Sequence, residues 1–215
     1  MSKAETLDAL MESAIHGFSK HGYEGASLRD IATHAHVPLS TIHFYFGSKS
    51  ELFLAVRRAA WAEIDQERSD LLEAALARSG PPQLEQLVHA LAYPIVRRAL
   101  SRDERDRAMI FIVRAHLAHS EPGLVGPMIR TADRSMVRWI DAMMACCPGM
   151  RRPDMIWAFS FVVGAIYSWQ LIDHRYDEMI GPDDDRSIDD VTQDIIAFCC
   201  SGIEAIGRRR ASPSD

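Results

Sequence analysis

Apolar residues recur along most of the chain at spacings of three and four, which places them on one face of a helix. The pattern starts at Leu7 and continues through Phe18, and Gly22 follows it where a helix end is expected. Ser2 and Glu5 precede the pattern with the S-x-x-E spacing of a capping box. The N-terminal segment is therefore predicted to be a helix that ends near Gly22.

Glycine and proline divide the rest of the chain into further helical segments. Ser27 begins a short second helix, and a third follows Pro38 and ends before Gly47. Later helices are predicted at residues 49–78, 83–99, 104–119, 122–146, 153–174 and 187–208. Because no stretch shows the alternation typical of a strand, the fold class is predicted to be all-α, with about nine helices.

The predicted helix at residues 49–78 is too long to belong to the small N-terminal group of helices alone. At about 1.5 Å per residue it extends over roughly 45 Å. We therefore expect it to link two domains. The first is a three-helix domain at residues 1–48, and the second is a larger helical domain at residues 49–215 that includes the linking helix.

Residues 155–172 (MIWAFSFVVGAIYSWQLI) are apolar nearly all round, which allows two interpretations. A membrane span is marginal at this length, and it would have to hold two serines and Gln170. A helix without a polar face can instead be buried on both sides, one of them against a partner subunit. Since the last helix also carries an apolar stripe, we predict no membrane association and a homodimer formed through helices 153–174 and 187–208.

The net charge of −6 argues at first against nucleic acid as a partner, but the distribution of charge changes this interpretation. Residues 31–50 contain no Asp or Glu, one lysine and three histidines. Because salt screens charges beyond about 8 Å, acidic groups elsewhere barely affect this segment. The two short helices and the tight turn between them predict a helix-turn-helix whose second helix enters the major groove of DNA.

The run ASLRDIATHAHVPLSTIHFYFGSKSELF resembles the signature of the TetR family of bacterial transcriptional regulators. The matching positions are Ser27, Ile31-Ala32, Val37, Thr41-Ile42-His43, Phe46 and Lys49, together with Phe18 and Gly22-Tyr23 of the first helix. The resemblance extends over roughly residues 5–56, and the rest agrees only in the number and length of helices and in the apolar last pair. The sequence departs from the family where His43 replaces the usual Tyr, and where Pro38 and Ser40 replace the common Ser and Gly.

The resemblance implies that side chains of this segment contact DNA. The residues expected to donate to phosphates are Ser27, Thr41, Tyr45 and Lys49. The residues expected to contact base edges are Arg29, Leu39, Ser40 and Phe44. His43 can also donate to a phosphate, and such a contact would depend on pH because histidine titrates near neutrality.

The resemblance further implies that the larger domain binds a small-molecule effector, which changes the spacing of two DNA-binding heads. The large side chains that could line its pocket are Trp61, Tyr93, Phe111, Trp139, Met143, Trp157 and Phe161, with Arg114 or His116 as a polar contact. Ordinary core packing is the alternative for the apolar side chains, and surface or inter-helix pairing is the alternative for Arg114 and His116. The aromatic and methionine content favours an apolar or amphipathic effector.

The four cysteines form two adjacent pairs, Cys146-Cys147 and Cys199-Cys200. Neighbouring cysteines make a poor disulfide framework and lack the spacing of zinc ligands, so we expect reduced thiols that pack in the core and no metal site. A redox-sensing pair is the alternative. Asp183-Asp184-Asp185 does not form a calcium loop, since the Gly and Glu that such a loop requires are missing.

Taken together, the residues and the resemblance predict a cytoplasmic, ligand-responsive transcriptional regulator without a cofactor. We expect a repressor that binds a palindromic operator in double-stranded DNA as a dimer. The sequence contains no H-E-x-x-H, no G-x-S-x-G and no Gly-rich phosphate loop, which argues against an enzyme. The alternative is an all-helical small-molecule-binding protein, or an enzyme, without DNA-binding activity.

Overall fold

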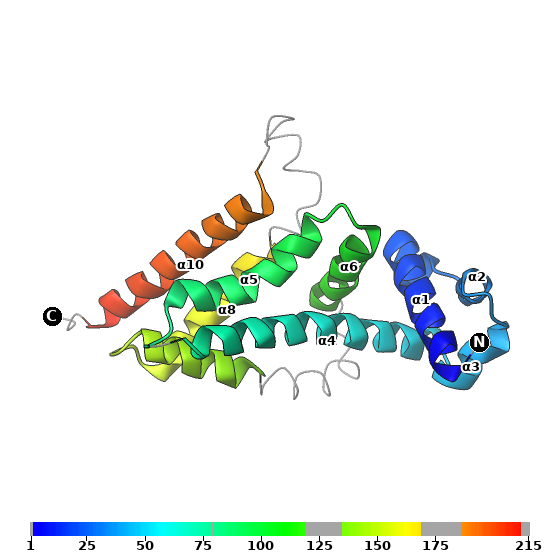
Figure 1. Ribbon diagram of the computed structural model, residues 1–215, viewed down its shortest axis with the longest axis horizontal. Coiled ribbons are helices and arrows are strands. Elements are labelled where there is room, and N and C mark those ends of the chain that lie inside the picture. Colours follow the sequence, from blue (N-terminus) through cyan, green and yellow to red (C-terminus); the bar gives the residue numbers. More distant parts are fainter. Residues whose placement is uncertain (1, 79, 119–134, 169–185, 212–215) are drawn as a thin grey trace. The chain divides into compact units, whose positions relative to one another are not determined.

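The computed structural model describes residues 2–78, 80–118, 135–168 and 186–211. Every regular element in these residues is a helix, which confirms the all-α fold class (Figure 1). The helices are α1 (Lys3–Gly25), α2 (Leu28–His34), α3 (Leu39–Phe46), α4 (Lys49–Leu76), α5 (Leu84–Ala99), α6 (Glu104–Ala118), α8 (Arg152–Ser168) and α10 (Ile188–Ala211). Residues 135–146 are helical as well. The predicted helix bounds are confirmed to within a few residues, except for residues 119–134 and 169–174, which lie outside the described residues.

Serine side chains cap the starts of α1, α2, α4 and α10. At α1 the capping box is complete, because Glu5 N–H donates to Ser2 Oγ (3.2 Å) and Ser2 N–H donates to the Glu5 carboxylate (2.8 Å). At α4 the N–H of Glu51 donates to Ser48 Oγ at 3.1 Å. These bonds satisfy donors that have no partner within a helix, and so they fix where each helix begins.

Positive φ angles mark the breaks among the first helices. Gly22 (φ 67°) interrupts the regular geometry of α1, and Gly47 (φ 76°) ends α3. His36 (φ 54°) lies in the turn between α2 and α3, where a side chain makes this conformation less favourable than it is for glycine. These three turns in the backbone set the directions of α2 and α3.

The chain divides into two compact units. The N-terminal unit comprises Met1–Glu63 and Ser101–Val125, and the C-terminal unit comprises Ile64–Leu100 and Gly126–Asp215. The division falls within α4, so this helix is shared by both units. The sequence predicts that the DNA-binding domain ends at residue 48, and this boundary stays a prediction.

In the N-terminal unit, α1 packs against α2 and α6, and α2 packs against α3. The core includes Leu10, Phe18 and Ile42, each with no exposed surface. A buried hydrogen bond from Ser13 Oγ to the carbonyl of Ile31 (2.8 Å) joins α1 to α2. This core holds α2 and α3 at a fixed angle without using their outward faces.

In the C-terminal unit, α10 packs against α5 and α8. Its core contains Leu87, Ile95, Met143 and Met155, all fully buried. No helix within the described residues is long and apolar enough to cross a membrane.

Candidate DNA-binding surface and regulatory sites

The helix-turn-helix is formed by α2, a tight turn and α3. Ile31 and Ala32 of α2 and Ile42 of α3 are buried, so these side chains anchor both helices to the core. In the turn, the N–H of Val37 donates to the carbonyl of Ala32 at 3.0 Å. Because Ile31, Ala32 and Ile42 face inward, the opposite face of α3 is left to solvent.

The residues predicted to contact bases lie on this outward side. Arg29 and Ser40 are exposed, and Leu39 is half-buried. Phe44 is 81% exposed, which is the largest exposed fraction among the exposed large apolar side chains of the described residues. An aromatic ring in such a position contributes nothing to the core, so its placement is suited to a contact with another molecule.

Among the predicted phosphate contacts, Lys49 is positioned by an aromatic cluster. Lys49 Nζ donates to the carbonyl of Glu24 at 3.0 Å and lies 5.0 Å from the centre of the Tyr23 ring. Tyr23 packs on Phe53, which packs on Phe18 with ring centres 4.9 Å apart. The ammonium group of Lys49, at the start of α4, is therefore held in a defined place. Ser27, another predicted phosphate contact, caps α2 by accepting from a backbone N–H at 3.4 Å.

His43 has a specific hydrogen bond that determines what its ring can donate. Its Nδ1 lies 3.1 Å from the carbonyl oxygen of Gly47. A carbonyl can only accept, so Nδ1 carries the hydrogen, and Nε2 of the neutral ring has only a lone pair. A phosphate contact through Nε2 therefore requires that both ring nitrogens carry a hydrogen.

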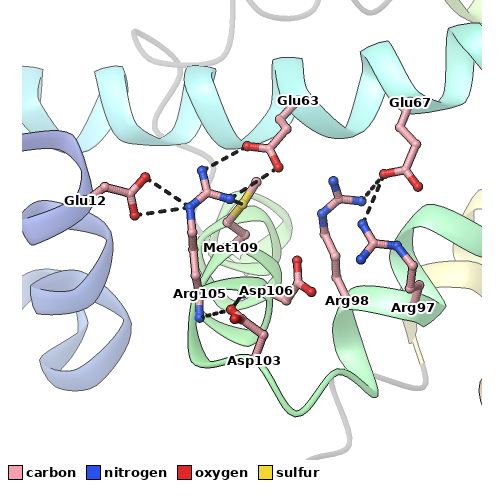
Figure 2. A network of polar contacts seen from close by, with 9 residues as sticks. All are labelled: Glu12, Glu63, Glu67, Arg97, Arg98, Asp103, Arg105, Asp106 and Met109. Carbon is pink, nitrogen blue, oxygen red and sulfur yellow. Dashed lines mark hydrogen bonds and ion pairs between the residues drawn. The ribbon is translucent and has the colours of Figure 1, made fainter. Parts of the chain in front are cut away.

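A network of charged side chains joins three helices of the N-terminal unit (Figure 2). Arg105 of α6 donates through Nε to Glu12 of α1 at 3.0 Å and through Nη2 to Glu63 of α4 at 3.1 Å. Its Nη1 also lies 3.1 Å from the sulfur of Met109. The hydrogen bonds to Glu63 and Glu12 raise the pKa of Arg105 above its usual range. Sequence analysis missed this residue, because a charged helix start is typical of a solvated surface.

In the C-terminal unit, α8 and α10 expose a contiguous apolar face. Trp157 is 65% exposed, Phe161 60% and Phe198 74%. Phe161 and Phe198 line an open groove of about 680 Å³ between the two helices, with the other lining side chains predominantly apolar. Burial of such a face requires a partner, since apolar surface gains free energy when it leaves water.

The residues predicted to line an effector pocket are distributed over both units. Trp139 and Met143 are buried in the C-terminal unit, where Tyr93 stacks on His89 with ring centres 5.1 Å apart. Trp157 and Phe161 belong to the exposed face described above. Trp61 and Phe111 lie in the N-terminal unit, and the side chains of Arg114 and His116 lie outside the described residues.

The cysteines are free thiols, and burial raises the pKa of Cys146 and of Cys199 to about 11 and that of Cys200 to about 12. Only a thiolate is a good nucleophile or metal ligand, so these values argue against redox sensing. Cys199 and Cys200 are buried as expected of core residues, whereas Cys146 and Cys147 are half-buried. Among the described residues, no group of His, Cys, Asp or Glu is arranged to hold a metal ion. The aspartate cluster at residues 183–185 lies outside the described residues.

Two comparisons with known families cover most of the chain. The family of bacterial regulatory proteins named tetR matches residues 10–56, which include the helix-turn-helix. The tetracyclin repressor-like C-terminal domain matches residues 89–202, more than half of the chain. The chain belongs to the TetR family. It is therefore a helix-turn-helix transcriptional regulator of a family of DNA-binding proteins rather than of enzymes.

Curated relatives match this TetR-family regulator over only part of their length. The transcriptional repressor NicS of Pseudomonas putida is 35% identical over 66 residues, which is 31% of each chain. The transcriptional regulator BetI of Agrobacterium fabrum is 34% identical over 82 residues, which is 38% of each chain. The matches thus span about a third of the length of these relatives.

Solved structures resemble the regulator over nearly the whole chain. A TetR-like transcriptional regulator from Rhodococcus sp. has a TM-score of 0.67 at 15% identity, covering 95% of this chain and 98% of that one. The fatty acid degradation regulator FadR of Bacillus halodurans has a TM-score of 0.65 at 14% identity, covering 91% of this chain and 98% of that one. At these identities the likeness establishes the fold.

Proposed function

We propose that this TetR-family regulator is a repressor that binds a palindromic operator as a homodimer and is released by a small effector. The observation that carries the proposal is the outward face of α3. Ser40 and Phe44 are exposed there, while Ile42 behind them is fully buried. Such a helix is held rigidly and still offers its side chains to the major groove. In this role the regulator acts on DNA in the cytoplasm.

The homodimer is supported by the apolar face of α8 and α10. A second copy of the chain is the occupant that fits best, because a face of this kind pairs with itself around a two-fold axis. Trp157, Phe161 and Phe198 would be the central contacts, since large aromatic side chains dominate most interfaces. We therefore assign Trp157 and Phe161 to the dimer interface in preference to the effector pocket. Two-fold symmetry of the protein implies two-fold symmetry of the operator.

Effector release requires that the C-terminal unit be coupled to the DNA-binding helices. Helix α4 is continuous from Lys49, a predicted phosphate contact, to Leu76 in the C-terminal unit. Arg105 binds α4 at Glu63 and α1 at Glu12, so a displacement of α4 or α6 would be transmitted to α1. An effector shifts the regulator away from DNA only if it binds the DNA-incompetent arrangement more tightly.

The test is selection of bound DNA from a random duplex library by the purified protein. We expect enrichment of a near-palindromic site, and a linear fall of the logarithm of affinity with the logarithm of salt concentration. The variant carrying Thr41→Ala and Lys49→Ala, checked for its fold and dimeric state, is the matched control and should enrich the same site far less at equal protein concentration. Failure of the folded wild-type dimer, freed of bound ligand, to enrich any sequence at low salt would refute the proposal.

A further inference from the structure

The core of the C-terminal unit contains a cation whose partners are neutral. Arg68 of α4 is only 6% exposed. Its Nε donates to the carbonyl of Leu91 at 2.8 Å, its Nη1 donates to the Tyr167 hydroxyl at 3.1 Å, and the guanidinium lies 5.6 Å from the centre of the Tyr167 ring. Within the described part of the chain, Arg68 forms no ion pair with a carboxylate.

A second buried arginine of the same unit differs from Arg68 in its partner. Arg98 of α5 is buried to a similar degree, at 3% exposure, but it forms an ion pair with Glu67 of α4. A buried charge is stable when an opposite charge accompanies it, and neutral hydrogen-bond partners compensate it only in part. A bound anion would therefore supply the opposite charge that Arg68 lacks among the described residues.

The position of Arg68 on α4 indicates what kind of anion would fit. Ile64 and Leu72 precede and follow it by one helical turn, so they lie on the same face, and each is 1% exposed. The guanidinium thus interrupts an apolar stripe.

We propose that Arg68 binds the anionic group of the effector, and that the effector is a carboxylate with an apolar body. The planar fork of a guanidinium matches the two oxygens of a carboxylate, and the apolar side chains around it match the body. This inference rests on the proposed function, because it assigns the effector class and one contact of the same regulatory unit. Binding would replace contacts of Arg68 with α5 and α8, and so it would act on α4 directly.

The experiment measures thermal stabilisation and calorimetric affinity with matched pairs of ligands. The carboxylates are octanoate, decanoate, palmitate, benzoate and 2-naphthoate, and each is compared with the alcohol of the same body. Wild type is compared with Arg68→Gln, with Arg68→Lys and with Arg97→Gln, a control at a half-buried arginine of the same unit. We expect at least one carboxylate to bind wild type and Arg97→Gln, and to bind Arg68→Gln about 10- to 100-fold more weakly. The affinity of wild type for this carboxylate should exceed its affinity for the matching alcohol by a similar factor.

The wild-type comparison of each acid with its alcohol keeps the test decisive if Arg68→Gln fails to fold. Equal binding of acids and alcohols, or no binding of any carboxylate to wild type, would overturn the assignment. Operator release separates this inference from the proposed function. A carboxylate that binds through Arg68 without releasing DNA would support the site and contradict effector release. Release of DNA by uncharged compounds, unchanged in Arg68→Gln, would support effector release and contradict the site.

Discussion

Exposed aromatic side chains occur in both units, but their surroundings differ. In the N-terminal unit, Phe44 of α3 is exposed beside polar residues such as Ser40 and His43. In the C-terminal unit, Trp157 and Phe198 belong to a contiguous apolar face on α8 and α10. An exposed ring beside polar side chains suits a contact with a thymine methyl group. A continuous apolar face suits a protein partner and is incomplete without one.

The units also differ in how they hold arginine. Arg105 in the N-terminal unit is bound by two carboxylates near the surface, which fastens three helices together. Arg68 in the C-terminal unit is buried with neutral partners. Arg105 is thus matched by carboxylates in the unit that we expect to bind DNA, whereas Arg68 has only neutral partners among the described residues of the unit that we expect to bind an effector.

The largest expected effect comes from placing a charge on the apolar face. Phe198→Glu would bury two carboxylates in a two-fold interface, one from each subunit. We therefore expect the free energy of dimerisation to weaken by about 4 kcal/mol or more, which raises the dimer dissociation constant roughly a thousandfold. Sedimentation equilibrium measures this change. The control is Leu76→Glu, at a residue of α4 in the same unit that is 43% exposed. Equal dimerisation of both variants would show that α8 and α10 do not form the interface.

The next largest effect concerns DNA. Removing the predicted phosphate contacts with Thr41→Ala and Lys49→Ala should weaken operator binding about 10- to 100-fold, and the salt dependence should become shallower because fewer phosphates are neutralised. Fluorescence anisotropy over a range of salt concentrations measures both. Arg102→Ala, which removes an exposed cation of the same unit outside α2 and α3, should leave binding unchanged. An unchanged affinity of the double variant would reject these contacts.

A smaller effect is expected at the network of Figure 2. Arg105→Gln removes ion pairs to Glu12 and Glu63, and since these pairs are partly exposed we expect the free energy of unfolding to fall by about 1 kcal/mol. Urea unfolding measures it. Arg107→Gln is the matched control, because Arg107 lies on the same helix and donates only to nearby carbonyls. A double-mutant cycle with Glu63→Gln should give a non-zero coupling energy, and additivity would contradict a shared network.

The smallest effect concerns the buried thiols. Burial raises the pKa of Cys199 to about 11 from the ordinary value of 9.0. Below pH 9 the thiol is protonated in the folded and unfolded states alike. As pH rises toward 11 the unfolded state loses its proton first, so stability should fall, on the order of 1 kcal/mol by pH 10. Urea midpoints at pH 8 and pH 10, compared with Cys199→Ala, measure this contribution. An equal fall in the variant would assign the pH dependence to other groups.

The helices and their ends were predictable because their signals are local. Ser48 begins α4 through a bond to the N–H three residues later, and Gly47 ends α3 by its own backbone conformation. The residues predicted to contact DNA follow the same principle, since short sequence separations fix which side of its helix each residue occupies. Their contacts with DNA stay predictions.

Long-range partners were not predictable from the sequence. Arg105 binds Glu12 across 93 positions of the chain, and nothing in the local pattern indicates such a pair. Arg68 carries a charge, so burial was not expected of it. Trp157 and Phe161 have the spacing of core residues, and only their exposure distinguishes an interface from a core.

The most direct test of a two-fold operator-reading regulator uses the selected site and a duplex in which one half-site is scrambled. Both affinities are measured with the same protein at one salt concentration, together with the number of chains bound per duplex. We expect two chains on the intact site and an affinity loss of about a hundredfold or more when one half-site is scrambled, since each half-site supplies several base and phosphate contacts. Equal affinities for the two duplexes, or one chain bound per intact site, would contradict a dimeric reader of a palindrome.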